Sequence, residues 1–200
     1  QVPGFDMIAD VFTANDGTGR DTNPTDAGDW VTAQEEANDP EFCQESDSSW
    51  HGTHVTGTIN AASGNNIGVA SVAPGVKTQA VRVLGKCGGY SSHIIDGIVW
   101  ASGGAADVAP ENATPADVIN MSLGGFGDCS VELQGAIDTA VGNGSTVVVA
   151  AGNSDENANN HFPANCDNTV TVAAIGEDGK RASFSNYGPA VDIAAPGVDI

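Results

Sequence analysis

The sequence predicts an α/β fold: a three-layer, doubly wound and mostly parallel sheet with helices on both faces. Two observations lead to this fold class. Short, continuous apolar runs such as residues 147–151 have the pattern of strands that are buried on both faces. These runs alternate with segments of helical periodicity, as in parallel α/β proteins. Ligands of such folds bind at the carboxyl ends of the strands.

The predicted elements follow one another without an internal repeat or a linker. Residues 1–50 are expected to be acidic and mostly loop, with a short strand at 4–8. A helix begins at His51 and ends near residues 61–64. The later elements, in chain order, are a strand at 76–84, a helix at 91–101, a strand at 118–121, a helix at 131–141, and strands at 147–151, 170–174 and 191–194.

Length and charge narrow the possible functions. The 200 residues are long enough for one domain with a substantial core. The 26 Asp and Glu residues against 6 Lys and Arg give a formal net charge of −20, so nucleic acid is not an expected partner. No apolar stretch is long enough to span a bilayer, so we expect no membrane partner. The chain opens at Gln1 without a Met, which suggests that an upstream segment has been removed or omitted.

The four cysteines predict two disulfides and a secreted protein. Cys43, Cys87, Cys129 and Cys166 are widely spaced and contain no C-x-x-C motif, which argues against a zinc or thioredoxin-type site. An even number of cysteines in this context is typical of an oxidising compartment. The sequence alone leaves three pairings open.

A histidine pair, His51 and His54, starts the first long helix. Both residues could be capping or core histidines, which is the usual role of such a pair. They could instead share one helix face as metal ligands, although no Cys or Glu-x-x-His spacing supports this. The third interpretation makes His51 the general base of a hydrolase, since imidazole titrates near neutrality.

An acidic loop precedes this helix. Its carboxylates stand at short spacing among glycines and can surround a hard cation, so we predict a calcium site there. The predicted ligands are Asp16, Asp21, Asp26 and Asp29. The alternative is a solvated acidic turn, because the spacing differs from that of an EF-hand.

Two strand ends carry groups suited to acyl transfer. Asn153 follows the strand at 147–151, where its amide could donate to the oxyanion of a tetrahedral intermediate. Ser122, Leu123 and Gly124 follow the strand at 118–121 and offer bare backbone to an extended peptide. A base, an amide donor and a peptide-binding edge together predict chemistry on a polypeptide.

From residue 48 onward the chain resembles the subtilisin-like serine proteases, or subtilases. The motifs that carry the resemblance are HGTHVTGT at 51–58, IGVASVAPG at 67–75, VRVLG at 81–85, NMSLGG at 120–125, VVVAAGN at 147–153, FPANC at 162–166 and ASFSNYGPAVDIAAPGV at 182–198. They occur in the family's order. The resemblance implies a secreted serine endopeptidase that is stabilised by calcium and acts on polypeptides as a monomer.

The resemblance also implies residue roles. His51 resembles the catalytic base, with His54 structural, and Asn153 resembles the oxyanion-hole amide. The segment 122–124 resembles the wall that pairs with the substrate backbone, and Ala151 and Gly152 resemble part of the specificity pocket. It implies disulfides between Cys43 and Cys87 and between Cys129 and Cys166. The acidic loop resembles the family's calcium loop.

The chain departs from the family pattern at both ends. The D-[ST]-G strand that carries the family's Asp and the G-T-S-M-A-x-P helix that carries its Ser are not found. We therefore interpret residues 1–200 as the central part of a subtilase catalytic domain, inactive alone, whose partners include the rest of that domain or a propeptide. The alternative is a degenerate subtilase: a non-catalytic calcium-binding or peptide-binding module.

Overall fold

The computed structural model describes residues 2–200, and these residues form two compact units. The first unit comprises Gln1–Gly97 and Ala106–Pro110, and the second comprises Ile98–Ala105 and Glu111–Ile200. The prediction that residues 1–200 are a single domain stays a prediction.

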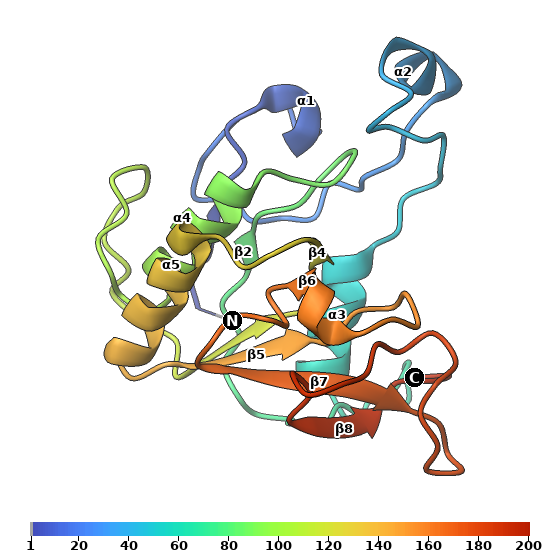
Figure 1. Cartoon of the computed structure of the whole chain (residues 1–200). Helices are drawn as coiled ribbons and strands as arrows, with labels where there is room; N and C mark the ends of the chain where they lie inside the picture. The colour runs from blue at the N-terminus through green and yellow to red at the C-terminus, as the bar shows by residue number, and fades with distance from the viewer. Residues whose placement is uncertain (1) are drawn as a thin grey trace. The chain divides into compact units, whose positions relative to one another are not determined.

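The first unit has little regular structure (Figure 1). Strands β1 (Phe5–Asp6) and β2 (Val81–Arg82) pair in parallel, with Asp6 opposite Arg82. Three helices belong to this unit: α1 (Val11–Ala14), α2 (Ala33–Asn38) and α3 (His51–Asn60). Long loops join these short elements.

A buried ion pair links the two short strands of this unit. A guanidinium nitrogen of Arg82 lies 2.6 Å from the carboxylate of Asp6, and the two side chains are only 8% and 0% exposed. Arg82 also donates a hydrogen bond to the carbonyl of Ala14 and contacts the carboxylate of Asp16 at 3.4 Å. Burial raises the pKa of Asp6, while the backbone N–H of Ile8 and Arg82 lower it. The side chain of Arg82 therefore joins β2 to β1 and to the loop after α1.

A second buried cation, Lys86, holds α1 and α2. Its ammonium lies 5.2 Å from the ring centre of Phe12 and 5.1 Å from that of Trp30, within cation–π range. It also lies 2.7 Å from the carboxylate of Glu35. Hydrogen bonding to Lys86 lowers the pKa of Glu35 to about 2, helped by the backbone and side chain of Thr32. The neighbouring disulfide Cys43–Cys87 closes this region covalently.

The second unit is built on a parallel sheet of order β3-β5-β7-β8 (Figure 1). Its strands are β3 (Val118–Met121), β5 (Thr146–Ala150), β7 (Thr169–Ile175) and β8 (Ile193–Pro196). A further antiparallel pair, β4 (Gly125–Phe126) and β6 (His161–Phe162), stands apart from this sheet, and a short 3₁₀ helix, η1 (Ala158–Asn160), precedes β6. The predicted α/β fold class with a parallel sheet is confirmed.

Helix α5 (Val131–Gly142) packs on β5 and supplies the apolar core of this unit. Ser130 caps the helix by accepting a hydrogen bond from the N–H of Leu133 at 3.1 Å. Leu133, Ala136, Ile137 and Ala140 are buried on one face. Every second residue of β5 is buried as well, namely Val147 and Val149.

Helix α4 (Ser91–Ala101) begins in the first unit and ends in the second. Its bounds and those of β3 coincide with the predicted ones, and α3 and α5 end within a few residues of their predictions. The strand predicted at 76–84 is reduced to Val81–Arg82, and the last strand begins two residues later than predicted. Helices α1 and α2, in the region expected to be loop, were not predicted.

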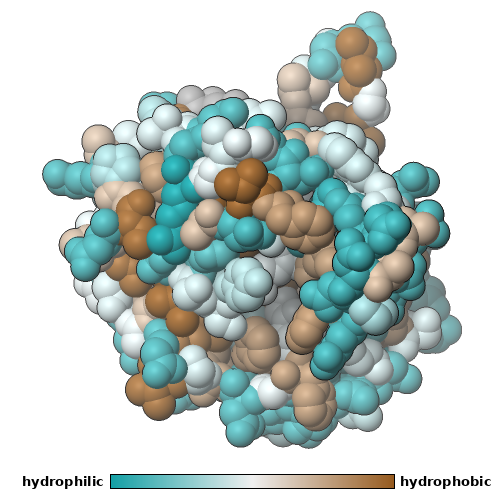
Figure 2. All heavy atoms as spheres, turned by 90° about the horizontal axis from the view of Figure 1, so that it is seen from above, coloured by the Kyte–Doolittle hydropathy of each residue, from teal (hydrophilic) through white to brown (hydrophobic). Residues whose placement is uncertain are grey.

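The face shown in Figure 2 carries many hydrophilic side chains, with small hydrophobic areas among them. Large apolar side chains such as Val72, Phe126 and Val131 are exposed. Single exposed apolar residues are normal in globular proteins and do not define an interface. None of the helices described for residues 2–200 has the length and apolar character needed to cross a bilayer.

Candidate active site

Two segments of the second unit leave the sheet side by side. Strands β3 and β5 are parallel neighbours in which Met121 stands opposite Val149. Ser122 is the first residue after β3, and Ala151 is the first residue after β5. The two strands therefore end beside each other. Both segments lie at the carboxyl edge of the sheet, where parallel α/β folds bind ligands.

The turn after β5 presents the side chain of Asn153 to solvent. Ala151 is almost fully buried and still bonds to the sheet, through its N–H and the carbonyl of Val172 at 2.9 Å. Gly152 then adopts a φ of +107°, a conformation that favours glycine. Asn153 is exposed, and its amide makes no side-chain hydrogen bond within the part of the second unit that the structure describes. An amide in this position can donate to a bound oxyanion.

The segment after β3 approaches another backbone closely. A Cβ added to Gly124 would lie 2.6 Å from the carbonyl oxygen of Phe162, so no side chain fits there. Beyond it, β4 pairs with β6, with Gly125 opposite Phe162 and Phe126 opposite His161. Within residues 111–200, the backbone of Ser122 and Leu123 makes no hydrogen bond to another strand. An extended peptide can therefore add to this edge.

His161, in strand β6, is buried. Nε2 of His161 lies 3.1 Å from a carboxylate oxygen of Glu156, and the His161 ring meets the Phe126 ring edge-on at 5.6 Å. A cis peptide bond joins Phe162 to Pro163. The contact between His161 and Glu156 was not predicted from the sequence.

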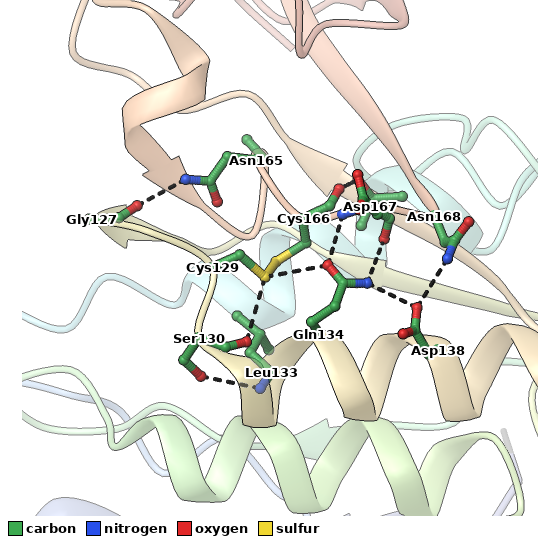
Figure 3. Close-up of a disulfide and its surroundings, with 12 residues drawn as sticks. Gly127, Cys129, Ser130, Leu133, Gln134, Asp138, Asn165, Cys166, Asp167 and Asn168 are labelled. Carbon is green, nitrogen blue, oxygen red and sulfur yellow. Dashed lines mark hydrogen bonds between the residues drawn. A yellow bond between two sulfur atoms is a disulfide. The ribbon is translucent and has the colours of Figure 1, made fainter.

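The disulfide Cys129–Cys166 joins the segments that follow β4 and β6 (Figure 3). It joins the residue before the α5 cap to the loop after Pro163. Gln134 reinforces the link, because its Oε1 accepts from the N–H of Asp167 at 2.8 Å and its Nε2 donates to the carbonyl of Asp167 at 3.0 Å. With Cys43–Cys87, this confirms the disulfide pairing that the resemblance implied.

The first unit contains the predicted base. His51 is the first residue of α3 and is exposed, and the N-cap residue before it, Trp50, has a left-handed φ of 51°. Ser49 orients this helix start: its hydroxyl donates to the carboxylate of Asp29 at 2.7 Å and accepts from the N–H of His51 at 3.3 Å. No carboxylate among residues 2–200 pairs with the His51 ring. The proposed cooperation of His51 with Asn153 stays a prediction, as does the structural role of His54.

The four predicted calcium ligands all have hydrogen-bond partners elsewhere in the chain. The hydroxyl of Thr18 lies within hydrogen-bond distance of both Asp16, at 3.0 Å, and Asp21, at 2.9 Å. The other two belong to separate contacts: Asp26 accepts from Thr53 at 2.7 Å and Asp29 from Ser49. Residues 2–200 contain no group of three or more His, Cys, Asp or Glu side chains arranged to hold a metal ion. This arrangement does not fit Ca²⁺, which needs six to eight oxygen ligands around one point, so the structure gives no support for the predicted site.

The structure thus brings the predicted substrate wall and oxyanion amide together at one sheet edge. The sequence did not single out Asn186, whose buried side chain contacts the turn around Asn153. It lies inside the motif at 182–198, but no periodicity or spacing marks a hydrogen bond between segments more than thirty residues apart.

Comparison with known proteins finds relatives over nearly the whole chain. Residues 10–199 match the Subtilase family. The chain is 54% identical over 198 residues to an extracellular protease of Xanthomonas campestris pv. campestris, covering 98% of this chain and 33% of that protein. It is 48% identical over 200 residues to an extracellular basic protease of Dichelobacter nodosus, again covering 33% of the relative.

A solved structure of a protease from Pseudoalteromonas arctica superposes with a TM-score of 0.93 at 54% identity, covering 98% of this chain and 57% of that one. The chain spans about a third of the length of the two curated relatives above. The predicted subtilisin-like fold is confirmed by the structural match. On this evidence, the chain belongs to the subtilase family.

Proposed function

We propose that this chain is the central part of an extracellular serine endopeptidase that hydrolyses polypeptides through an acyl-enzyme. The observation that carries the proposal is the turn at Gly152–Asn153. It presents an exposed carboxamide beside the unpaired edge at Ser122–Gly124, both at the carboxyl end of a parallel sheet. The extracellular names of two close relatives and the two disulfides support secretion.

In this proposal a peptide extends along Ser122–Gly124 and places its scissile carbonyl beside Asn153. His51 takes the proton from a serine hydroxyl outside residues 1–200 as the serine oxygen attacks the carbonyl carbon. The amide of Asn153 donates to the oxyanion that forms. His51 then gives the proton to the leaving amine, and water hydrolyses the acyl-enzyme by the same route. An aspartate outside this chain orients His51.

Peptide hydrolysis by His51→Ala in the full-length protein tests the proposal. Loss of the base histidine in a subtilisin lowers kcat about 10⁶-fold, and we expect this established family magnitude here. The matched control is His54→Ala, which should keep measurable hydrolysis. Thermal melting of both variants checks that they fold.

Labelling with an organophosphorus serine reagent tests the nucleophile separately. The phosphorylated serine should map outside residues 1–200. An active His51→Ala variant, or an unlabelled wild-type protein without hydrolytic activity, would refute the protease and favour the non-catalytic peptide-binding module.

A further inference from the structure

We propose that Asn186 is a positioning residue that fixes the turn carrying Asn153. The inference rests on the proposed function, because it assigns Asn186 a role through the oxyanion donor. Asn186 is fully buried, at 0% exposure. Its side chain contacts the backbone on both sides of Asn153, so it holds the turn without touching substrate itself.

The carboxamide of Asn186 uses both of its ends on this turn. Its Nδ2 donates to the carbonyl of Ala151 at 2.9 Å, on the N-terminal side of Asn153. Its Oδ1 accepts from the N–H of Ser154 at 2.9 Å and from the N–H of Glu156 at 3.1 Å, on the C-terminal side. No other amino acid supplies one donor and one acceptor at these points with the same length.

The backbone of Asn186 adds a fourth bond. Its N–H donates to the carbonyl of Gly152 at 2.9 Å. A Cβ added to Gly152 would lie 2.2 Å from Nδ2 of Asn186, so the glycine is required for the close approach. The backbone is therefore held at residues 151, 152, 154 and 156, and the exposed Asn153 lies between the second and the third of these points.

Asn186 is itself rigidly anchored. The hydroxyl of the preceding Ser185, 1% exposed, donates to the carbonyl of Asn186 at 3.0 Å and accepts from the N–H of Ala174 in β7 at 2.9 Å. The following Tyr187 exchanges backbone hydrogen bonds with Glu156 and Ala158. Ser185 and Asn186 thus link the turn to strand β7 by hydrogen bonds.

A rigid support of this kind matters because an oxyanion donor acts by being in place before charge develops. If the turn moves, the ground state still binds along the substrate wall at Ser122–Gly124. The transition state, however, loses its aligned donor. A loosened turn should therefore lower kcat and leave KM nearly unchanged.

The test uses Asn186→Asp in the full-length protein. The substitution keeps the size and the accepting oxygen but replaces the donor to Ala151 with a second acceptor. We expect kcat to fall about 10-fold or more while KM changes less than about 2-fold. Loss of the donor itself in a subtilisin lowers kcat about 10²–10³-fold, and this established value is the upper bound.

Thr171→Val is the matched structural control. Thr171 is 1% exposed and donates to the carbonyl of Ala164 at 3.1 Å, and its side chain makes no hydrogen bond to residues 151–156. This variant should lower the melting temperature and leave kcat within about 2-fold. If Asn186→Asp yields no folded protein, Asn186→Ser is measured against the same criteria.

A double-mutant cycle with Asn153→Ala separates the positioning role from a general one. In the Asn153→Ala background, Asn186→Asp should change kcat less than about 3-fold, because the positioned group is gone. An undiminished loss in that background, or a change confined to KM, would overturn the inference. If Asn153→Ala alone leaves kcat unchanged, the proposed oxyanion role fails instead, whatever Asn186 does.

Discussion

The two units of the chain are stabilised by different means. In the first, Arg82 and Lys86 bury their charges against Asp6, Glu35 and aromatic rings, and the paired strands β1 and β2 have two residues each. In the second, a four-stranded parallel sheet buries alternate apolar side chains against a capped helix. A sheet with many backbone hydrogen bonds provides a fixed frame, whereas a loop-rich unit depends on a few specific contacts.

This difference determines which unit can hold a reacting side chain in a fixed position. A cluster of small buried side chains, Ala151, Ala158, Ala164 and Ala173, packs beneath the turn that carries Asn153. Small residues allow close backbone approach, and the hydrogen bonds of Asn186 then fix the turn. In the first unit, His51 is the first residue of α3, and no residue of this helix is buried. The comparison predicts that the two units respond differently to substitution.

The largest effect is expected from Arg82→Met in the first unit. The substitution leaves the carboxylate of Asp6 buried and without its cation, and breaking a buried ion pair in this way costs about 3–5 kcal/mol. Urea titration of the full-length protein measures the free energy of unfolding. Lys180→Met is the control, since the Lys180–Asp178 pair is exposed and should contribute less than about 1 kcal/mol. Equal effects of the two variants would show that burial of the first pair is unimportant.

The corresponding effect in the second unit should come from Ile137→Ala. Ile137 is fully buried on α5, and deletion of such a side chain costs about 2–5 kcal/mol through lost burial and the cavity that remains. Val131→Ala, on the same helix at 85% exposure, should change the free energy of unfolding by less than about 0.5 kcal/mol. A large effect at Val131 would mean that this face of α5 is covered in the full-length protein.

The sequence predicted elements with periodic burial better than elements that are held by contacts between distant residues. Elements α4, β3 and α5 were located well, because they follow from apolar runs with clear ends, and periodic burial leaves a periodic sequence. Helices α1 and α2 were not predicted, because α2 buries no residue and is held by Glu35 contacting Lys86. A contact between residues 51 positions apart leaves no local pattern.

The candidate site follows the same rule. Asn153 and the segment at 122–124 could be predicted, since they stand directly after apolar strands. Asn186 could not, because its role depends on three hydrogen bonds to a turn that precedes it by about thirty residues. The carboxylates of the acidic loop have the composition of a cation site, but hydroxyl and N–H groups of the folded chain occupy their oxygens.

A smaller, pH-dependent effect is expected in the first unit at His93. Burial lowers the pKa of His93, with a further lowering by Arg20, against the opposing effect of Asp96, Asp6 and Asp10. The N–H of Ala9 donates to Nε2 at 3.4 Å, and within residues 2–200 Nδ1 has no hydrogen-bond partner. Below the ordinary pKa of 6.5 the unfolded chain binds a proton that the folded chain resists, so stability decreases as pH falls.

Melting temperatures of wild type and His93→Gln between pH 8 and pH 5 measure this contribution. Glutamine can still accept from Ala9 but does not titrate, so the variant should lose less stability than wild type as pH falls through about 6.5. The many carboxylates of the chain titrate at lower pH in both proteins and cancel in the difference. Parallel curves would show that His93 is not held neutral by its surroundings.

The smallest effect, close to zero, is expected for calcium at the acidic loop. Asp16 and Asp21 are bridged by the hydroxyl of Thr18, and the cation that contacts Asp16 is the guanidinium of Arg82. A full-length subtilase can bind calcium elsewhere, so the informative quantity is a difference between variants. Asp16→Asn with Asp21→Asn should leave the calcium-induced shift in melting temperature unchanged, because binding at another site contributes equally to both proteins. A shift that disappears in this variant would show that calcium displaces the internal hydrogen bonds, and the first unit would then depend on a metal as well as on its buried ion pairs.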